Sequence, residues 1–412
     1  MSSPVHQTIL VTGAGGFIGK VVVNALLQRG WRVKAMMRTT RPCPAEVIIA
    51  DMRDAGSLRT ALTGCTAVVH LAAAKSDEPD SDDVNIEGAK RLVEACRAAG
   101  CRRIINMSTQ SAKIVRKGAY ARTKSAADEI FHASGLDVTT LMPSVVYGDE
   151  KTGVFGTVLT FIEKLPVVPV LGDGQWISAP VHVDDVAGAI VACLDHNKTV
   201  GKRYDIAGPD QLTFDALIDK LGAGIGKRRP KLHIPVGLAL FIANIVAKLL
   251  PKPPITVSNV LGSNQNTDID IEPARRDFGF NPVGLDAGLK RVLDDPEACR
   301  LARYLLGVTP SRELQTRYAT ARAKLLGDDA EWRFVCRHPW TLPFVDAASS
   351  LLRPQSSVRQ RIFLMAAVLE TTPDYADFFL TTPSPATLVW QGLRATAKTA
   401  VGIPILALAR RG

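Results

Sequence analysis

Over the first 140 residues, short apolar runs alternate with longer segments in which apolar residues recur every three or four positions. The apolar runs have the length of buried strands and lie at 9–11, 31–37, 47–50, 67–71 and 103–107. The segments at 20–29 and 85–99 have helical spacing, and a glycine follows each of them. Strands that alternate with helices predict an α/β fold with a doubly wound parallel sheet.

The first predicted strand runs into a glycine-rich turn, TGAGGFIG, and a helix follows the turn. A strand, a glycine turn and a helix open the dinucleotide-binding unit of a Rossmann fold. The glycines permit a tight turn and a close approach of a pyrophosphate, which the N–H groups of the helix then face. The spacing is GxxGxxG, and a purely structural turn is the alternative. The expected cofactor contacts here are Thr12, Gly13, Gly16, Phe17, Ile18 and Gly19.

At the end of the second predicted strand stands Arg38, where a fold that prefers NAD carries a carboxylate for the ribose 2′-hydroxyl. A guanidinium at this position pairs with a 2′-phosphate, so we predict NADP(H), with NAD(H) as the second choice. The plainer interpretation is an arginine that only ends a strand. Residues after the third and fourth strands lie at the same edge of the sheet. The contacts expected from them are Asp51, Met52, Leu71, Ala72 and Ala73.

The strongest chemical signal is the YxxxK motif of Tyr120 and Lys124, at the start of a segment with helical pattern. Positions four apart share one face of a helix, so the lysine ammonium can favour the tyrosine phenolate and make the tyrosine an acid or base near neutral pH. A hydroxyl of Ser108 or Thr109, after the fifth strand, can hydrogen-bond the substrate oxygen. The motif alone also occurs by chance, and its position after a nucleotide-binding unit favours the catalytic interpretation.

Composition narrows the class of protein. The chain has 412 residues, which favours two domains, and a formal net charge of +10, which suits anionic cofactors or an anionic membrane surface. No basic–aromatic cluster or zinc-finger spacing points to nucleic acid. Seven scattered cysteines without a CxxC motif, and an N-terminus without signal-peptide features, favour a cytoplasmic protein. We expect no metal site, because the acidic turn at 182–185 is better explained as the start of a helix capped by Asp184.

Taken in order, several segments resemble the extended and atypical short-chain dehydrogenase/reductase superfamily of the NAD-dependent epimerase/dehydratase type. They include TGAGGFIG at 12–19, HLAAA at 70–74, VNIEGAKRLVEAC at 84–96, NMST at 106–109, YARTK at 120–124 and PVHVDDVAGAIVACL at 180–194. The resemblance covers residues 5–295. It implies that Tyr120 is the catalytic acid/base and Thr109, or Ser108, its hydroxyl partner. It also implies that Lys124 binds the nicotinamide ribose and that Pro143 and Val145 lie beside the nicotinamide.

Departures from the family pattern bear on the substrate. Only ten residues separate Thr109 from Tyr120, which is similar to the branch that includes the NADPH-binding accessory subunit of respiratory complex I. Met142 replaces the usual arginine before the proline, and Arg38 replaces an acidic residue. These differences argue against a nucleotide-sugar substrate.

Two domains are predicted, a nucleotide-binding domain over 1–300 and an appended helical domain over 301–412. The apolar segment 236–250 is too short to span a bilayer, and it is either an interfacial helix or a helix that covers the substrate pocket. The leading hypothesis is an NADP(H)-dependent oxidoreductase acting on a sugar derivative or an apolar alcohol or ketone, with a homodimer as one arrangement. The competing hypothesis is a non-catalytic NADPH-binding scaffold that docks to a membrane or a protein complex.

Overall fold

The computed structural model describes residues 7–74, 80–115, 117–148, 153–241, 266–293 and 315. The chain divides into two compact units, one of residues 1–223 with 227–292 and one of residues 224–226 with 293–412. The account below concerns the first unit. The predicted helical domain over 301–412 lies outside the described residues, apart from Gln315, and stays a prediction.

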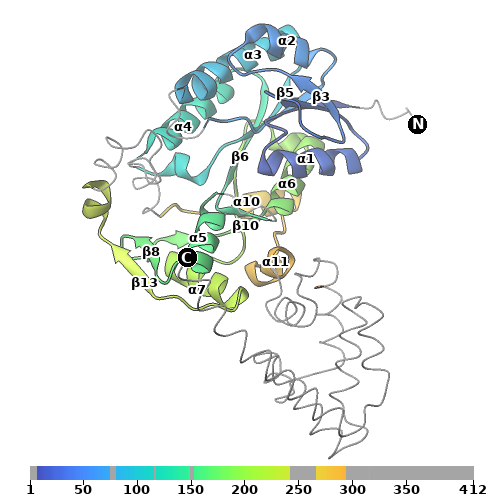
Figure 1. The fold of residues 1–412 in the computed structure, drawn as a ribbon. Coiled ribbons are helices and arrows are strands. Elements are labelled where there is room, and N and C mark those ends of the chain that lie inside the picture. Colours follow the sequence, from blue (N-terminus) through green and yellow to red (C-terminus); the bar gives the residue numbers. More distant parts are fainter. Residues whose placement is uncertain are drawn as a thin grey trace, which may run out of the picture. The chain divides into compact units, whose positions relative to one another are not determined.

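A seven-stranded parallel sheet forms the centre of the first unit, with the strand order β11-β6-β5-β4-β1-β2-β3 (Figure 1). The chain starts in the middle of the sheet, builds one half outward, and returns to build the other half, as the alternating pattern predicts. The strands are β1 (Thr8–Thr12), β2 (Arg32–Met37), β3 (Glu46–Ile49), β4 (Ala67–His70), β5 (Arg103–Met107), β6 (Asp137–Pro143) and β11 (Arg203–Ile206).

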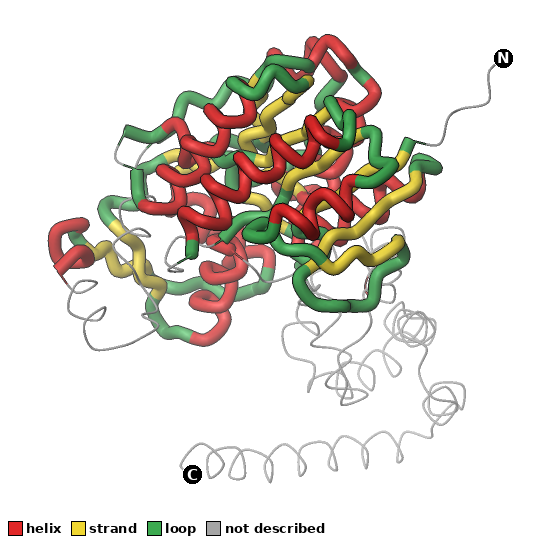
Figure 2. Tube along the Cα trace, turned by 90° about the horizontal axis from the view of Figure 1, so that it is seen from above, coloured by secondary structure: helices red, strands yellow, loops and turns green. Residues whose placement is uncertain are grey.

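Helices cover both faces of this sheet (Figures 1 and 2). Helices α2 (Ala55–Leu62), α3 (Gly88–Ala98) and α4 (Ala119–His132) pack against one another on one face. Helices α1 (Phe17–Gln28) and α6 (Val183–Asp195) pack together on the other face. Each face buries its own apolar cluster, centred on residues such as Leu10 and Leu58 or Ile9 and Ile190. Because both faces are covered, the central strands carry runs of buried apolar residues such as Ile9–Val11 and Val68–Val69.

A smaller region is built from two-stranded sheets and helices that come both before and after β11 in the sequence. The strands are β7 (Val146–Tyr147), β8 (Val168–Leu171), β9 (Ile177–Ser178), β10 (Val181–His182), β12 (Leu212–Thr213) and β13 (Lys231–Ile234). The helices are α5 (Gly153–Lys164), α7 (Phe214–Gly224), α10 (Glu272–Phe278) and α11 (Leu285–Val292). This region lies against the start of α1 at Gly148, which is packed so closely on the ring of Phe17 that an added Cβ would lie 3.0 Å from it.

The predicted fold class is confirmed, and one local prediction is wrong. Helix α6 is capped by His182, whose Nδ1 accepts from the N–H of Asp184 at 3.3 Å, so Asp184 is not the cap. His182 is the cap because it is the residue directly before the first helical position, Val183. Among the described residues no helix is long and apolar enough to cross a membrane. The part of the predicted interfacial segment beyond Phe241 lies outside the described residues.

Candidate active site

A row of buried polar side chains crosses the sheet toward the carboxyl ends of its strands. Strand register pairs Thr12 with His70, His70 with Asn106, and Asn106 with Thr140, in four adjacent strands. All four side chains are buried. Parallel strands in a common register bring such residues side by side, although they are far apart in sequence. The predicted cofactor and acid/base residues lie at or just beyond this row.

The glycine turn is pressed against the end of β4. Gly13 has φ +70°, and a Cβ there would lie 2.8 Å from the amide nitrogen of Ala72. A Cβ on Gly19 would lie 2.3 Å from the carbonyl oxygen of Gly13. Gly16 caps α1 without any side-chain hydrogen bond, so the first turn of the helix is left to an anion or to water. The turn therefore fits a dinucleotide pyrophosphate.

Thr12 ties this turn to β4 rather than pointing freely toward a cofactor. Its hydroxyl oxygen accepts from the N–H groups of Leu71 and Ala72, each at 3.2 Å. The hydroxyl hydrogen is then left for Nδ1 of His70, 2.9 Å away, which places the imidazole proton on Nε2. Burial, reinforced by the charge of Lys124, lowers the pKa of His70 to about 3. This histidine is therefore a neutral core residue at working pH.

Basic side chains surround the turn near the end of β2. Arg38 is exposed, and Nη1 of Arg41 lies 3.5 Å from the carbonyl oxygen of Gly15. Asp51 is held by Arg53, with the two guanidinium–carboxylate contacts at 3.0 and 2.8 Å. This hydrogen bonding holds the pKa of Asp51 below its usual range, with a smaller contribution from the charge of Arg38. The one carboxylate expected at the cofactor is thus already paired.

The remaining expected contacts after β3 and β4 differ in what they expose. The side chain of Met52 is buried against Gly88 of α3, so only its backbone is free to face a cofactor. Leu71 and Ala72 are half-buried and Ala73 is exposed. The small residues Ala72 and Ala73 after β4 thus leave space beside the glycine turn, where a cofactor can lie close to the backbone.

Tyr120, Lys124 and Asp128 occupy successive turns of one face of α4. Lys124 and Asp128 are 3% and 4% exposed. Burial lowers the pKa of Lys124, and the charge of Asp128 opposes that shift. Burial, with the same carboxylate, raises the pKa of Tyr120. This direction is opposite to the phenolate expected from the motif, because burial disfavours the charged phenolate and the carboxylate of Asp128 adds to that effect.

The two candidate hydroxyls after β5 point to different partners. The hydroxyl of Ser108 donates to Oδ2 of Asp128, so it faces the helix. The hydroxyl oxygen of Thr109 accepts from the N–H of Ser111 at 3.3 Å and keeps its own hydrogen for another acceptor. Thr109 is also the less buried of the two. The geometry therefore favours Thr109 as the group that faces a substrate oxygen.

Pro143 is the last residue of β6, and Val145 follows two positions later. Pro143 is buried and pairs with Ile206 of β11, and Val145 is half-buried. Just after Thr109, Nε2 of Gln110 donates to the carbonyl of Met142 at 2.9 Å and to Asp205 at 2.8 Å. This amide fixes the loop that carries Thr109 against the end of β6.

Asn85 is a site residue that the sequence reasoning missed. Its amide group accepts from the N–H of Ala74 at 2.9 Å and donates to the carbonyl of the same residue at 3.3 Å. It also donates to the hydroxyl of Thr123 at 3.0 Å, which in turn donates to the carbonyl of Tyr120. Asn85 thereby links the end of β4 to the helix that carries the YxxxK motif. Its position in a π-helical turn, Asp83–Glu87, is consistent with a functional distortion.

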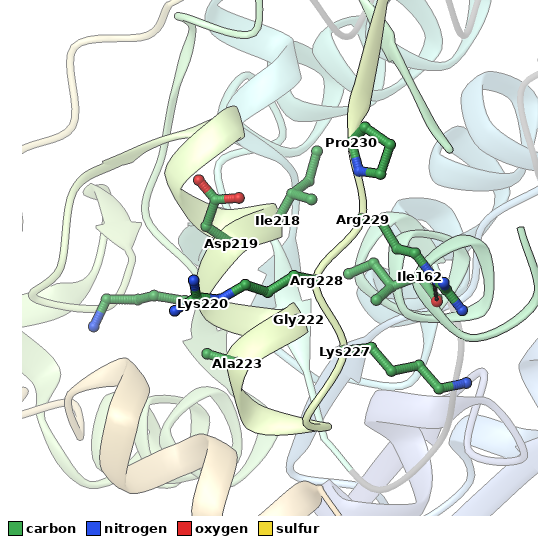
Figure 3. A pocket seen from close by; sticks show the side chains of 10 residues that line it. All are labelled: Ile162, Ile218, Asp219, Lys220, Gly222, Ala223, Lys227, Arg228, Arg229 and Pro230. Atoms are coloured by element: carbon green, nitrogen blue, oxygen red, sulfur yellow. Dashed lines mark hydrogen bonds between the residues drawn. The ribbon is translucent and has the colours of Figure 1, made fainter. Parts of the chain in front are cut away.

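A cavity of about 720 Å³ lies elsewhere, between α7 and residues 227–230 (Figure 3). None of its lining residues is an expected site residue. The side chains of Lys227 and Arg229 donate to carbonyls at the end of α5, those of Glu163 and Ile162. Such cations stabilise the negative end of a helix, so this basic cavity is explained by capping. Within the described ranges no group of three acidic, histidine or cysteine side chains can hold a metal ion.

Comparison with known proteins agrees with this geometry. The NAD dependent epimerase/dehydratase family matches residues 9–207. Sterol demethylase protein B of Methylococcus capsulatus is 30% identical over 319 residues, which cover 68% of this chain and 95% of that protein. The mitochondrial NADH dehydrogenase (ubiquinone) 1 alpha subcomplex subunit 9 of Arabidopsis thaliana is 28% identical over 267 residues, which cover 60% of this chain and 66% of that protein.

Among solved structures, the dTDP-glucose 4,6-dehydratase DesIV of Streptomyces venezuelae, with NAD and TYD bound, superimposes with a TM-score of 0.58. The match covers 69% of this chain and 95% of the dehydratase at 22% identity. At this identity the likeness establishes the fold alone.

Proposed function

The chain belongs to the NAD-dependent epimerase/dehydratase family, and from that premise we propose that it is an NADP(H)-dependent oxidoreductase that reduces an apolar ketone or oxidises the matching alcohol. Bound at the glycine turn, the cofactor would supply or accept the hydride. The observation that carries the proposal is the group of Tyr120, Lys124 and Thr109 at the carboxyl edge of the sheet, beside a turn that fits a dinucleotide.

Each side chain has a distinct part in this chemistry. A phenol whose pKa is raised stays protonated at neutral pH, so the half-buried Tyr120 is suited to donate its proton to a carbonyl oxygen as that oxygen gains charge. Thr109 donates a second hydrogen bond to the same oxygen. Lys124 binds the cofactor ribose and places a positive charge beside the tyrosine. This assignment favours the reductive direction.

The test is the substitution Tyr120→Phe, which removes the proton donor and keeps the ring. General acid catalysis contributes about 10²–10⁴-fold, so turnover should fall by that factor while NADPH affinity changes little. The matched control is Tyr147→Phe, since the buried Tyr147 hydroxyl has no hydrogen-bond partner within the described residues. Stopped-flow oxidation of NADPH and fluorescence titration supply the two readouts. Unchanged turnover in Tyr120→Phe excludes this mechanism.

The preference for NADP(H) is proposed from the charges around the end of β2. Arg38 and Arg41 are cationic, and Asp51 is neutralised by Arg53, so a 2′-phosphate meets no free carboxylate there. Reversing the charge with Arg38→Asp should lower the ratio of NADPH to NADH affinity by about 10–100-fold, the worth of a hydrogen bond to a charged group. Arg32→Asp, at the opposite end of the same strand, is the control. A ratio that moves equally in both variants contradicts the assignment.

An apolar substrate is proposed on two grounds. The relative that matches along 95% of its own length carries a sterol in its name. Met142 stands where an arginine would bind an anionic sugar nucleotide, which removes one charged contact. Cofactor oxidation should therefore be measured with a panel of keto-sterols and long-chain ketones beside nucleotide-sugar ketones. Activity confined to the sugar substrates would overturn this choice.

The second candidate function is an NADPH-binding scaffold without turnover, with residues 301–412 as the part that binds a partner. A relative named as a subunit of NADH dehydrogenase favours it. In that case Tyr120→Phe should behave as wild type in cells while Gly19→Ala, which blocks the cofactor turn, should not. Loss of function in both variants supports the enzyme.

Contact with a membrane surface is proposed for the segment that begins at Val236. In its described part, Leu238 and Phe241 are 51% and 63% exposed, so two large apolar side chains three positions apart lie at the surface. The paired substitution Leu238→Ser and Phe241→Ser should halve or abolish co-sedimentation with anionic vesicles. Equal sedimentation of variant and wild type would contradict this membrane contact.

A further inference from the structure

The buried carboxylate of Asp128 has no role in the reaction proposed above, yet it accepts a hydrogen bond from Ser108 and lies one helical turn from Lys124 on the same face of α4. Its Oδ2 accepts from the hydroxyl of Ser108, and its Oδ1 accepts from Nδ2 of Asn106 at 2.7 Å. Asn106 is itself fixed by its contact to Thr140 at 3.2 Å. The carboxylate is therefore held rigidly between β5 and α4.

We propose that Asp128 is a positioning residue that acts as the counter-ion of Lys124 and keeps that lysine protonated at the buried face of α4. The inference rests on the proposed function, in which Lys124 binds the cofactor ribose. A buried ammonium without an opposite charge nearby has a lowered pKa and loses its proton readily. A carboxylate on the next helical turn raises that pKa, so the lysine keeps its proton. Burial raises the pKa of Asp128, and the hydrogen bonds to both carboxylate oxygens, together with the charge of Lys124, oppose that shift and favour the charged form that this role requires.

The other charged groups around the pair favour this assignment. On the β4 side stands His70, which is neutral and supplies no negative charge. The cation of Arg203 acts on Asp128 from β11, but its guanidinium is already paired with Glu129 at 2.7 Å. Tyr120 and His132 lie on the same helix, and the charge of Asp128 acts on both of them. Neither side chain is negatively charged at neutral pH, so neither can be the counter-ion of Lys124. Asp128 is thus the carboxylate that acts on Lys124 within the described residues.

The test follows the protonation of Lys124 by the pH dependence of NADPH affinity in the full-length protein, measured by fluorescence without turnover. In Asp128→Asn the pH at which affinity is lost on the alkaline side should fall by about 1–2 units, the usual effect of removing a close opposite charge. Asp128→Glu should restore much of the difference. Glu129→Gln removes the neighbouring exposed carboxylate of the same helix and should leave the midpoint unchanged.

Ser108→Ala separates the two roles of the contact, because it removes the hydrogen bond and keeps the carboxylate. We expect its midpoint to stay closer to wild type than that of Asp128→Asn. An Asp128→Asn variant whose affinity falls equally at every pH, with an unmoved midpoint, shows a merely structural residue and overturns the proposal. The same holds if Glu129→Gln shifts the midpoint as far.

A folding defect would also be informative. If Asp128→Asn does not fold, the double substitution with Lys124→Met, which removes both charges, should restore the folded state; failure of the pair shows that Asp128 is needed for packing alone. A wild-type protein that does not bind NADPH refutes the proposed function instead. The interaction of Lys124 with Asp128 is then tested by the pH dependence of the rate of Lys124 acetylation, compared among wild type, Glu129→Gln and Asp128→Asn.

Discussion

The two halves of the candidate site hold their geometry by different means. The cofactor turn between β1 and α1 is shaped by backbone atoms, because Gly13 and Gly19 leave no room for a Cβ. The acid/base end, between β5 and α4, is shaped by buried polar side chains such as Ser108, Asn106 and Asp128. The first is steric, with Gly19 against the backbone of its own turn and Gly13 against the backbone of Ala72. The second is electrostatic and joins residues about 20 positions apart.

This difference teaches which kinds of change each half tolerates. A close-packed turn fails when volume is added, whatever the charge of the added group. A network of buried polar groups fails when one partner is removed, because the others are then left without water or a hydrogen bond. His70 stands where the halves meet, since it contacts Thr12 and feels the charge of Lys124.

The largest expected effect concerns His70 and pH. The pKa of His70 is about 3 in the fold against 6.5 when unfolded, so the unfolded chain binds more protons between these values. The stability linked to this histidine is therefore complete above pH 6.5 and is lost as pH falls toward 3. At pH 4 the loss is 2.5 pH units, or roughly 3 kcal/mol at about 1.36 kcal/mol per unit.

Urea unfolding of wild type and His70→Asn at pH 7 and pH 4 checks this value. The substitution removes the titrating group, so the gap between the two proteins should narrow, or change sign, at pH 4. A gap that stays constant means that the imidazole is not the group responsible, and that the two halves are not coupled through it.

The second prediction tests the steric half with a matched pair of glycines. Gly19→Ala should weaken NADPH binding and cost about 3 kcal/mol of stability, because its Cβ would meet backbone atoms at 2.3 and 2.8 Å that cannot move independently. Gly15→Ala should be tolerated, since the nearest atoms are ordinary contacts at 3.5 Å or more. Cofactor titration and thermal unfolding decide the matter. Equal effects of the two substitutions would contradict the steric explanation.

The third prediction tests the polar half. Asn85→Ala leaves the backbone groups of Ala74 and the hydroxyl of Thr123 without their partner, which should cost about 2 kcal/mol. It should also raise the KM for cofactor, because the end of β4 is no longer fixed to α4. Asn24→Ala, on the exposed side of α1, is the control and should change neither quantity. Loss of stability without any change in KM would restrict Asn85 to folding.

The sequence by itself determined the parts of this protein that depend on neighbouring residues. Apolar runs and glycine stops predicted the order of strands and helices through β5, and the doubly wound parallel sheet follows from that alternation. The glycine turn and the YxxxK face of α4 were also predictable, because turn and helix geometry relate residues only a few positions apart.

Only the tertiary structure decided how distant polar groups share the interior. Strand register placed Thr12, His70 and Asn106 in one row, and the packing of α4 turned Ser108 toward Asp128 and left Thr109 free to donate. The same packing reversed the expected direction of the Tyr120 pKa shift. These outcomes depend on burial and on polar groups that the fold brings together from the strands and from α4. The amino-acid sequence does not give the distances between these groups, so the electrostatics of the site could be worked out only from the fold.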